Sequence, residues 1–376
     1  MDTGLTAVIL AGGAGTRLRP LTYARRKELV PVLNRPLLEY RLRNLREHGV
    51  THVVLACSQG MREVEQHFGD GADLGIRLSY NYEERPLGSG RAVKEAARAA
   101  GASGTLVVCN GDILTNLDLT GMLARHRASG ATLSISLAPV DDPWHYGVVE
   151  VDGGLRIGSF VEKPPRGEEP SNLINAGTWL FEPEVLARVP DDESAVRDGF
   201  SERVLFPGII ASGLHVQGFI EDLWVDVGSP ERYLRANRLL LERVAGELGE
   251  DTLGLEGSDV ADDAQIVGLV CIGAGATVSA GARIAGPAVI GPEATVDAGA
   301  VVEASVLWER AHVGAGARVT GSILGATSSV GERAVVRGAV LADGAQVAAG
   351  CRPADGTRLL PAETADGGRP GERPLR

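Results

Sequence analysis

The sequence predicts two folds in succession: an α/β domain with a Rossmann-like mixed sheet, followed by a left-handed parallel β-helix. Two observations predict them. In the first part of the chain, short apolar runs alternate with segments in which leucines recur at helical spacing, the pattern of strands joined by crossover helices. In the last part, aliphatic residues recur at every sixth position, and three such hexads make one coil of a β-helix.

The composition limits the classes of partner that the protein can bind. With 376 residues and a net charge of −12, the chain has the length of two to three domains and an acidic surface. Such a surface disfavours a nucleic-acid polymer or an anionic membrane, because both require a basic face. Small phosphorylated substrates remain compatible, since a local cluster of arginine and lysine can outweigh the global charge.

The sequence also predicts a cytoplasmic protein. It has no run of about 18 apolar residues to span a bilayer, and the N-terminal apolar run lacks the basic leader and cleavage site of a signal peptide. The four cysteines are far apart and have no metal-ligand spacing. We therefore expect small core residues or free thiols in a reducing compartment.

The most informative stretch begins with the apolar run of residues 5–11, which is typical of a buried parallel strand. Residues 12–15, Gly-Gly-Ala-Gly, follow it, and glycines there allow the backbone to approach an anion and turn its N–H groups toward it. Arg17 and Lys27 add positive charge close by in the sequence. The loop lacks the Gly-Lys-Ser/Thr of a P-loop and the third glycine of a dinucleotide fingerprint, so the residues alone leave a simple tight turn equally open.

Six further segments place polar residues or glycines near the ends of expected strands. They are Glu83-Glu84-Arg85-Pro86-Leu87-Gly88-Ser89-Gly90, Asn110-Gly111-Asp112, Tyr146-Gly147, Glu162-Lys163-Pro164, Asn175-Ala176-Gly177 and Trp224-Val225-Asp226-Val227-Gly228. Strand ends of this kind are where α/β proteins bind ligands. Each segment also has an ordinary interpretation, since Asn-Gly-Asp can be an Asx turn and Glu-Lys-Pro is often an exposed pair before a turn.

Taken together, these segments resemble one family. The string GGAGTRLRPLT, a lysine five residues after Thr22 and the following LVPV resemble the signature of the sugar-1-phosphate nucleotidyltransferases, also called nucleoside-diphosphate-sugar pyrophosphorylases. The later segments occur in the family's order. A catalytic domain followed by a β-helix is similar to the arrangement in mannose-1-phosphate guanylyltransferases and their relatives. The resemblance implies that the α/β part is a Rossmann-like nucleotidyltransferase domain.

The resemblance also implies roles for individual residues. Nucleotide binding falls on Ala11, Gly12, Gly13, Gly15, Thr16, Glu84, Gly88 and Ser89, and sugar-phosphate binding on Gly147, Glu162, Lys163, Asn175 and Gly177. The positions that match catalytic residues are Arg17, Lys27 and Lys163, and those that match the ligands of a catalytic Mg²⁺ are Asp112 and Asp226. A carboxylate at the carboxyl end of a strand suits such a metal.

Glu84 bears on the choice of nucleobase. In the resembled family the loop of residues 83–90 lies against the base. A carboxylate there can accept hydrogen bonds from both N1–H and the 2-amino group of guanine, a pairing that uracil and thymine do not offer. Glu84 therefore points to GTP, although two solvated glutamates at a strand end are an equally good interpretation.

The resemblance implies a reaction that needs little from the protein except alignment and charge. The phosphate of a sugar 1-phosphate attacks the α-phosphorus of a nucleoside triphosphate, and pyrophosphate leaves; the attacking phosphate is already largely dianionic at neutral pH. The glycine loop and Arg17 would hold the β- and γ-phosphates, and Lys27 would neutralise charge on the α-phosphate. Lys163 would orient the incoming phosphate.

Two departures from the family pattern affect this expectation. Arg26 and Glu28 flank Lys27 where the family usually has two prolines, and Arg91 stands where the base loop usually has a second glycine. A loosened lysine could align poorly, and Arg91 could crowd the nucleotide or reach its phosphates. Two functions therefore stay open. One is an active nucleotidyltransferase whose acceptor is a sugar 1-phosphate or a cyclitol 1-phosphate, and the other is a non-catalytic relative that binds a nucleotide-sugar and regulates a partner enzyme.

The C-terminal part carries the hexads. Branched residues recur six apart from Ile266 to Val302, and the period then slips by one residue, which gives coils of 17 residues. The sequence thus predicts a nucleotidyltransferase domain at 1–235, a linker helix and connector at 236–260, the β-helix at 261–351 and a disordered tail at 352–376. Stacked coils often form oligomer surfaces, so we expect a homo-oligomer, a dimer or tetramer. An acyltransferase of this fold would need a histidine with a partner, and His312 has no evident partner carboxylate in the sequence.

Overall fold

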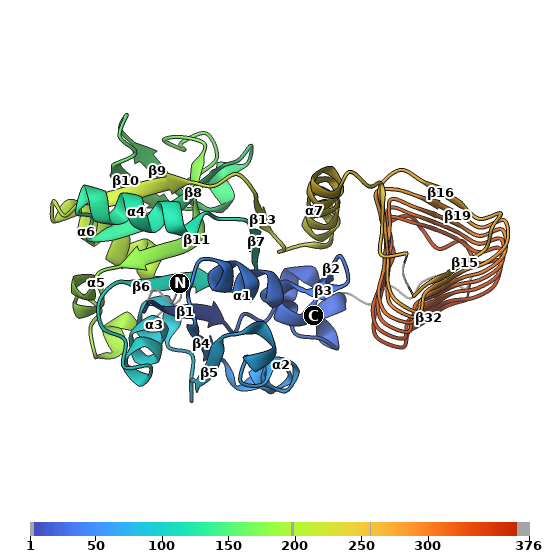
Figure 1. The fold of residues 1–376 in the computed structure, drawn as a ribbon, viewed down its shortest axis with the longest axis horizontal. Helices are drawn as coiled ribbons and strands as arrows, with labels where there is room; N and C mark the ends of the chain where they lie inside the picture. The colour runs from blue at the N-terminus through green and yellow to red at the C-terminus, as the bar shows by residue number, and fades with distance from the viewer. Residues whose placement is uncertain (1–3, 197–198, 256, 367–376) are drawn as a thin grey trace. The chain divides into compact units, whose positions relative to one another are not determined.

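The computed structural model describes residues 4–196, 199–255 and 257–366 (Figure 1). Contacts within the chain divide it into two units. Unit 1 comprises the described residues of Met1–Gly13 and of Leu37–Val225, and unit 2 comprises those of Ala14–Pro36 and of Asp226–Arg376. The chain therefore changes unit three times, whereas the sequence predicted an uninterrupted nucleotidyltransferase domain at 1–235.

Unit 1 is built on a mixed β-sheet. Its strands are β1 (Thr6–Ala11), β4 (His52–Cys57), β5 (Arg77–Tyr82), β6 (Leu106–Asn110), β8 (Leu133–Pro139), β9 (Gly147–Val151), β10 (Ile157–Glu162), β11 (Leu173–Phe181) and β12 (Val216–Ile220). The order along the sheet is β10-β9-β11-β6-β1-β4-β5, and β8 pairs with β11 and β12. Strand β1 is parallel to β4 and β6, whereas β11 is antiparallel to β6, β8 and β9. The predicted Rossmann-like mixed sheet is therefore confirmed.

Helices pack on this sheet. They are α1 (Leu37–Glu47), α2 (Arg62–Phe68), α3 (Gly88–Ala99), α4 (Leu119–Ser129), α5 (Pro183–Ala187) and α6 (Phe206–Ala211). Two short strands, β7 (Ile113–Thr115) and β13 (Trp224–Asp226), pair with each other in a separate sheet. Helix α3 packs on β1 and β4, and α4 packs on β8 and β12. Asp118 caps α4 by accepting a hydrogen bond from the N–H of Gly121 (2.9 Å). Helix α3 begins at Gly88, so the end of the glycine-bearing loop forms its first turn.

One carboxylate is buried in unit 1 just after β12. Glu221 is 4% exposed, it accepts a hydrogen bond from the hydroxyl of Thr115, and the guanidinium of Arg41 acts on its charge. Burial outweighs these partners and raises the pKa of Glu221 to about 7, since removal from water disfavours the charged carboxylate. In the unfolded chain such a group loses its proton near a pKa of about 4.3. Between these two values the folded state binds more protons than the unfolded state, so the free energy of unfolding falls as the pH rises through this range.

Replacing Glu221 with glutamine is therefore expected to stabilise the protein more at pH 8 than at pH 5. The amide retains an acceptor for the Thr115 hydroxyl and removes the charge that is costly at high pH. Thermal unfolding at both pH values measures the effect, and we expect the gains in Tm to differ by several degrees, since 1 kcal/mol corresponds to roughly 2–4 °C for a unit of this size. Glu47→Gln, at an exposed position at the end of α1, is the control. An equal gain at both pH values for Glu221→Gln would mean that the carboxyl is ionised in the folded protein.

Unit 2 begins with residues 14–36. Short 3₁₀ turns at Thr16–Leu18, Leu21–Tyr23 and Lys27–Leu29 precede a small hairpin of β2 (Pro31–Val32) and β3 (Arg35–Pro36). The unit continues with α7 (Pro230–Leu248), which Ser229 caps by accepting a hydrogen bond from the N–H of Arg232 (3.3 Å). Pro230 occupies the first helical position, and Gly249, with φ of 71°, ends the helix.

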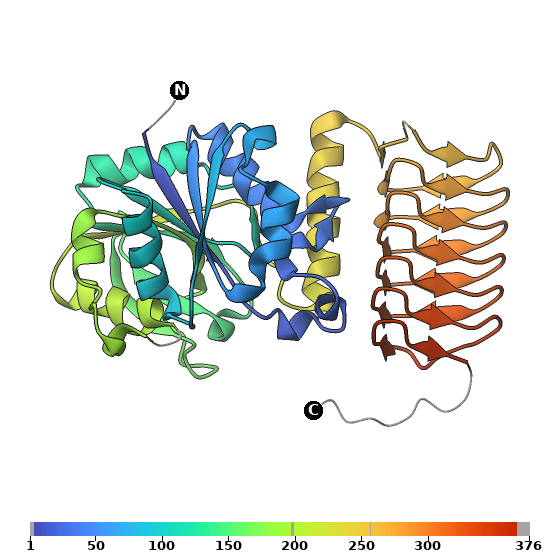
Figure 2. The same cartoon turned by 90° about the horizontal axis from the view of Figure 1, so that it is seen from below.

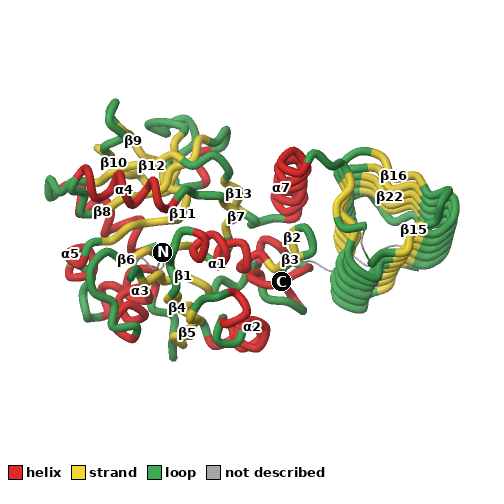
Figure 3. Tube along the Cα trace, viewed as in Figure 1, coloured by secondary structure: helices red, strands yellow, loops and turns green. Residues whose placement is uncertain are grey.

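A stack of coils follows α7. Its strands are β14 (Thr252–Leu253), β15 (Asp259–Val260), β16 (Gln265–Val267), β17 (Val270–Ile272), β18 (Thr277–Val278), β19 (Arg283–Ala285), β20 (Ala288–Ile290), β21 (Thr295–Val296), β22 (Val301–Glu303), β23 (Val306–Leu307), β24 (His312–Val313), β25 (Arg318–Thr320), β26 (Ile323–Leu324), β27 (Ser329–Val330), β28 (Val335–Arg337), β29 (Val340–Leu341), β30 (Gln346–Val347), β31 (Arg358–Leu359) and β32 (Thr364–Ala365). They form three parallel sheets. Figure 1 shows the triangular outline of the coils end-on, Figure 2 shows them stacked, and Figure 3 shows loops at the corners between the strands. The arrangement is that of the predicted left-handed parallel β-helix.

The hexads fill the interior of these coils. Ile284 and the other branched hexad residues from 272 onward are buried, with alanines between them. In the first coils the partner of a residue lies eighteen positions on, as Val270 pairs with Ala288. After the slip it lies seventeen positions on, as Val306 pairs with Ile323.

The β-helix is longer at both ends than the sequence predicted. Strands β14 and β15 pair with β17 and β18, so the first coil begins within the predicted connector at 236–260. Strands β31 and β32 pair with β29 and β30. The prediction of a disordered tail is therefore wrong for residues 352–366, and residues 367–376 lie outside the described residues. Leu359, which is 6% exposed, and Ala365 take interior positions of a further coil, although the Gly- and Pro-rich sequence around them obscures the hexad.

His312 does have a partner carboxylate, contrary to our expectation from the sequence. Its Nε2 lies 2.8 Å from Oδ2 of Asp297, fifteen residues earlier. In a stack whose coils are 17 or 18 residues long, that spacing places the two residues on adjacent coils. The side chains are 45% and 35% exposed, so the pair joins neighbouring coils at the surface.

The described residues also bear on two simpler expectations. Cys57, Cys109 and Cys351 are buried and Cys271 is half-buried, and all four are free thiols. Within the described ranges, no helix has both the length and the apolar character that crossing a bilayer would require.

Candidate functional site

A pocket of about 540 Å³ lies in unit 1 beyond the carboxyl ends of β1 and β4. Its walls come from the glycine loop after β1, from the segment after β4 and from the segment that leads into α3. The lining residues are Leu10, Ala11, Gly12, Gly13, Ala56, Ser58, Gly60, Glu83, Glu84, Arg85, Pro86, Gly88, Ser89 and Ala92. The structure thus brings together six of the predicted nucleotide-binding residues, Ala11, Gly12, Gly13, Glu84, Gly88 and Ser89.

The glycines after β1 leave room where two strand ends converge. A Cβ on Gly12 would lie 3.1 Å from the backbone nitrogen of Ser58 and 3.2 Å from its Cβ, so the close approach of these segments favours glycine. A Cβ on Gly13 would meet nothing within 4 Å, which leaves open space beside the backbone. Such a loop can present its N–H groups to an anion.

Asp112 follows the neighbouring strand of the same sheet. Strand β6 pairs with β1 in a register that sets Asn110 beside Leu10, and the N–H of Gly111 donates to the carbonyl of Leu10 (3.0 Å). Asp112 is the next residue and is half-buried. Its position is therefore at the sheet edge from which the glycine loop also leaves.

The hydroxyl of Ser89, in the first turn of α3, has two partners from a remote segment. It donates to Oε2 of Glu202 (3.1 Å) and accepts from the backbone N–H of Ser201 (3.1 Å). Next to it, a Cβ on Gly90 would lie 2.5 Å from the ring of Phe200. The segment around residue 201 therefore packs closely on the start of α3 and fixes the orientation of the Ser89 hydroxyl.

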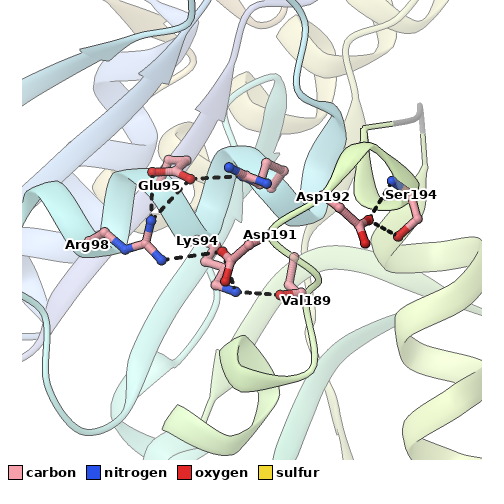
Figure 4. Close-up of polar contacts among 8 residues, drawn as sticks. Lys94, Glu95, Arg98, Val189, Asp191, Asp192 and Ser194 are labelled. Atoms are coloured by element: carbon pink, nitrogen blue, oxygen red, sulfur yellow. Dashed lines mark hydrogen bonds and ion pairs between the residues drawn. The ribbon is translucent and has the colours of Figure 1, made fainter.

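Farther along α3, a charged network joins the helix to residues 189–191 (Figure 4). The Lys94 ammonium donates to the carbonyl of Val189 and pairs with Asp191 (2.9 Å). Arg98 reaches the same carboxylate (3.4 Å) and also pairs with Glu95 (3.3 Å). This network attaches helix α3 to residues 189–191, in addition to its contacts with Ser201 and Glu202.

Arg91 takes neither of the positions that we expected from the sequence. Its Nε donates to Oε1 of Glu95 (2.9 Å), one turn farther along α3, so the guanidinium lies along the helix. The pairing explains how the helix accommodates an arginine where the family usually has glycine.

The predicted sugar-phosphate residues lie on three adjacent antiparallel strands of unit 1. Gly147 at the start of β9 pairs with Glu162 at the end of β10, and a Cβ on Gly147 would lie 2.9 Å from the Glu162 carboxylate. Asn175 and Gly177 are on β11. The amide oxygen of Asn175 accepts from the N–H of Gly177 (3.0 Å) and from the indole of Trp179 (2.8 Å), which leaves the NH₂ group as the donor for a ligand.

Gly177 connects this group of residues to the Asp112 segment. With φ of 80°, it occupies a conformation that favours glycine, and a Cβ there would lie 2.7 Å from the amide nitrogen of Asn110. Lys163, in contrast, has a positive φ of 49° without being glycine, and its side chain is 58% exposed. Its ammonium lies 3.4 Å from the carboxylate of Glu162, the neighbouring residue.

In unit 2, the remaining predicted catalytic residues gather around one carboxylate. Asp226 is 8% exposed and faces Arg232 Nη1 at 2.8 Å, Lys27 Nζ at 3.8 Å and Arg17 Nη2 at 3.9 Å. One negative and three positive charges leave a local excess of positive charge on an acidic chain. Such an excess attracts phosphate groups.

Glycines allow these side chains to approach one another. Gly15, with φ of 60°, accepts a hydrogen bond from the hydroxyl of Thr22 (2.8 Å), and a Cβ there would lie 3.4 Å from Cβ of Lys27. A Cβ on Gly228 would lie 2.8 Å from both carboxylate oxygens of Asp226. Thr16 begins the 3₁₀ turn that carries Arg17.

Two residues of these sites were missed from the sequence. Glu202 is 113 residues from Ser89, and no local pattern indicates that the two meet. Arg232 could have been found, because Ser229-Pro230 marks a helix start and a residue in the first turn can reach back to Asp226.

Comparison with known proteins identifies both parts of the chain. Residues 6–243 match the nucleotidyl transferase family, and residues 266–364 match the family described as GMPPB C-terminal domain. The mannose-1-phosphate guanylyltransferase of Mycobacterium tuberculosis is 35% identical over 280 residues, which cover 72% of this chain and 76% of that protein. The UTP–glucose-1-phosphate uridylyltransferase of a Synechocystis species is 34% identical over 329 residues, which cover 81% and 83%.

The fold of the chain also has a solved counterpart. A Bacillus anthracis protein that carries the name of a glucose-1-phosphate thymidylyltransferase superposes with a TM-score of 0.55 at 22% identity, over 62% of this chain and 94% of that one. At this identity the likeness concerns the fold alone. The matching family models and the relatives above 30% identity settle membership: this chain belongs to the nucleotidyl transferase family, among the sugar-1-phosphate nucleotidyltransferases.

Proposed function

We propose that the protein transfers a guanylyl group from GTP to the phosphate of a sugar 1-phosphate, with Mg²⁺ as cofactor, and releases pyrophosphate. A cyclitol 1-phosphate is an acceptor of the same chemical class. The relatives include both guanylyl- and uridylyltransferases by name, so the preference for GTP depends on the pocket itself.

The observation that carries this proposal is the carboxylate of Glu84 in the wall of the pocket in unit 1, which Arg85 also lines. Glu84 is an exposed carboxylate in the lining of the pocket. The Ser89 hydroxyl donates its hydrogen to Glu202, so toward a ligand this hydroxyl can only accept a hydrogen bond. Glu83 accepts from the N–H of Leu87 (3.0 Å) and holds the turn between them. The two carboxylate oxygens of Glu84 favour a base edge with two adjacent donors, and guanine presents N1–H and the 2-amino group where uracil and thymine present one N–H.

The chain's own residues would act by holding and neutralising two anions. The backbone of Gly12 and Gly13 and the side chain of Arg17 would bind the β- and γ-phosphates, and Lys27 would lower the charge on the α-phosphate. Lys163 would orient the acceptor phosphate as its oxygen forms the new bond to the α-phosphorus. The bond from that phosphorus to the β-phosphate oxygen breaks, and pyrophosphate carries the electron pair away.

The donor set fits Mg²⁺. This ion takes oxygen ligands and is usually held by one or two carboxylates, with substrate phosphates and water completing its shell. Asp112 and Asp226 are the carboxylates proposed here; Arg232 donates to Oδ2 of Asp226, and the Lys27 ammonium lies 3.8 Å from Oδ1. The described residues contain no group of three or more His, Cys, Asp or Glu that could hold a metal, so phosphates and water would supply the other ligands. When bound, Mg²⁺ would stabilise the negative charge that develops around the α-phosphorus.

The direct test is pyrophosphate release with Mg²⁺, measured for each nucleoside triphosphate crossed with a panel of sugar and cyclitol 1-phosphates. Turnover with GTP and one acceptor supports the proposal. Turnover with UTP or dTTP at higher kcat/KM would overturn the base assignment. Silence across the panel, with nucleotide-sugar binding still detected by calorimetry, would instead support the non-catalytic regulatory alternative.

Glu84→Gln is expected to lower kcat/KM for GTP by about 10- to 100-fold and to change kcat/KM for UTP much less. Glutamine replaces one of the two acceptor oxygens with an NH₂ donor, which faces a donor on guanine and leaves a hydrogen bond unmade. Steady-state kinetics with both nucleotides measures the change in preference. Glu63→Gln, at an exposed position on α2, is the matched control. An equal loss for both nucleotides would show that Glu84 does not read the base.

A further inference from the structure

Within unit 2, the loop that carries Lys27 contacts the β-helix on the N-terminal side of the lysine and helix α7 on its C-terminal side. The contacts converge on one group of side chains, called here the Trp308 cluster and consisting of Arg25, Tyr233, Trp308, Glu309 and Asp343. Because Arg26 and Glu28 stand where the family usually has prolines, the stiffness of this loop has to come from such tertiary contacts.

Arg25 makes the contact on the N-terminal side, two residues before Lys27. Its guanidinium binds both carboxylate oxygens of Glu309, lies 3.9 Å from Asp343 and stacks 4.9 Å from the ring centroid of Trp308. The side chains of Arg25 and Glu309 are 22% and 26% exposed. A bidentate, partly buried ion pair whose guanidinium stacks on an aromatic ring is stronger than an ordinary surface ion pair.

Tyr233 makes the contact on the C-terminal side, four residues after Lys27. Its hydroxyl donates to the carbonyl of Pro31, and the indole N–H of Trp308 donates to that hydroxyl (2.9 Å). Tyr233 and Trp308 are at most 1% exposed. The same tryptophan therefore supports both ends of the short segment between residues 25 and 31.

The lysine has little freedom between these two contacts. Lys27 opens a 3₁₀ turn in which the N–H of Val30 donates to the Lys27 carbonyl (3.1 Å). Lys27 is 6% exposed and Glu28 is 3% exposed. The ammonium of Lys27 is thereby held 3.8 Å from Asp226.

We propose that Arg25 and Trp308 are positioning residues for Lys27, so that the β-helix supplies the rigidity that flanking prolines would otherwise give to the loop. The inference rests on the proposed role of Lys27 at the α-phosphate. Loss of the contacts lets the lysine leave its position without changing the phosphate-binding glycines. Because a displacement of about 1 Å at a reacting centre can cost about 10²-fold in rate, the effect falls on kcat.

The first experiment compares variants of the cluster in steady-state kinetics with the full-length protein. Arg25→Ala is expected to lower kcat by about 10- to 100-fold and to change KM for the nucleotide by less than about threefold. Arg25→Lys keeps a charge without the planar fork, and Trp308→Phe keeps a ring without the N–H, so both should fall between wild type and Arg25→Ala. Arg333→Ala, which removes an 82% exposed arginine of the same β-helix, should leave kcat unchanged.

The second experiment does not depend on activity, so its failure can be told apart from a failure of the proposed function. The chain has three lysines, Lys27, Lys94 and Lys163, and labelling with an amine-reactive reagent followed by peptide mass spectrometry reports on each. In Arg25→Ala, Lys27 should be labelled at least about fivefold faster than in wild type. Lys163, which is already 58% exposed, should be labelled at an unchanged rate.

These outcomes decide the proposal in either direction. Faster labelling of Lys27 in Arg25→Ala together with a fall in kcat supports it. Unchanged labelling of Lys27 in Arg25→Ala overturns it whatever the activity. If Arg25→Ala does not fold, kcat and the labelling rate of Lys27 are measured in Trp308→Phe, which is a smaller perturbation.

Discussion

Lys27→Ala is expected to lower kcat by about 10²- to 10³-fold while the protein remains folded. The ammonium lies at a nearly buried position beside Asp226, where little water is present to replace it as charge develops on the α-phosphate. Removing one preorganised group of this kind typically costs such a factor. The fold should tolerate the change, because Arg232 at 2.8 Å keeps the Asp226 carboxylate paired. Single-turnover rates and Tm, measured on the same preparations, give both quantities.

The matched control is the other partly buried lysine. Lys94→Ala removes the hydrogen bond to Val189 and the ion pair with Asp191 (Figure 4), so it should lower Tm and change kcat by less than about threefold. Equal losses of kcat for Lys27→Ala and Lys94→Ala would mean that both act through the fold. A kcat within threefold of wild type for Lys27→Ala would remove this lysine from the chemistry.

Asp112→Ala is expected to abolish Mg²⁺-dependent turnover, with a loss of at least about 10³-fold in kcat/KM. A metal at the reacting phosphate supplies several kcal/mol of charge stabilisation, and each 1.4 kcal/mol corresponds to about tenfold in rate. Asp112 is half-buried at the end of β6, beside the glycine loop, and it offers a carboxylate at the sheet edge where a ligand is expected. Turnover as a function of Mg²⁺ concentration measures the effect.

Asp118→Ala is the control for Asp112→Ala, because it removes a nearby aspartate that is not expected to bind the metal. Asp118 caps α4, so its removal should cost about 1 kcal/mol of stability and leave the Mg²⁺ dependence unchanged. If Asp112→Ala keeps Mg²⁺-dependent activity within tenfold of wild type, Asp112 is not a metal ligand.

The β-helix could be predicted from the sequence because its pattern is local and periodic. A branched residue such as Ile284 is buried wherever the six-residue period places it, whatever the remote parts of the chain do. The last coil was missed because Leu359 and Ala365 keep the interior positions while glycine and proline around them dilute the pattern. The same coil length explains the His312–Asp297 pair, which becomes visible once the spacing between coils is known.

The sequence predicts the site residues that directly follow a strand better than those positioned by contacts with distant segments of the chain. The glycine loop and Asp112 follow buried strands, so their neighbourhood in a parallel sheet follows from the sequence. The contact between Ser89 and Glu202 spans 113 residues, and that between Arg25 and Glu309 spans 284. Such pairs are set by the tertiary arrangement of distant segments, and no periodicity or motif within either segment indicates them.

Chimeras between members of this family are constrained by the course of the chain through its two units. Residues 14–36 precede most of unit 1 in the sequence, yet they pack in unit 2 with α7 and the coils. A crossover at residue 226 would keep the native Arg25 and Pro31 but replace their partners Glu309, Trp308 and Tyr233 with residues of the other family member. The Lys27 loop and the coils around Trp308 must therefore be exchanged together, although they are far apart in the sequence. A substitution in either segment is tolerated only if it keeps the contacts with the other.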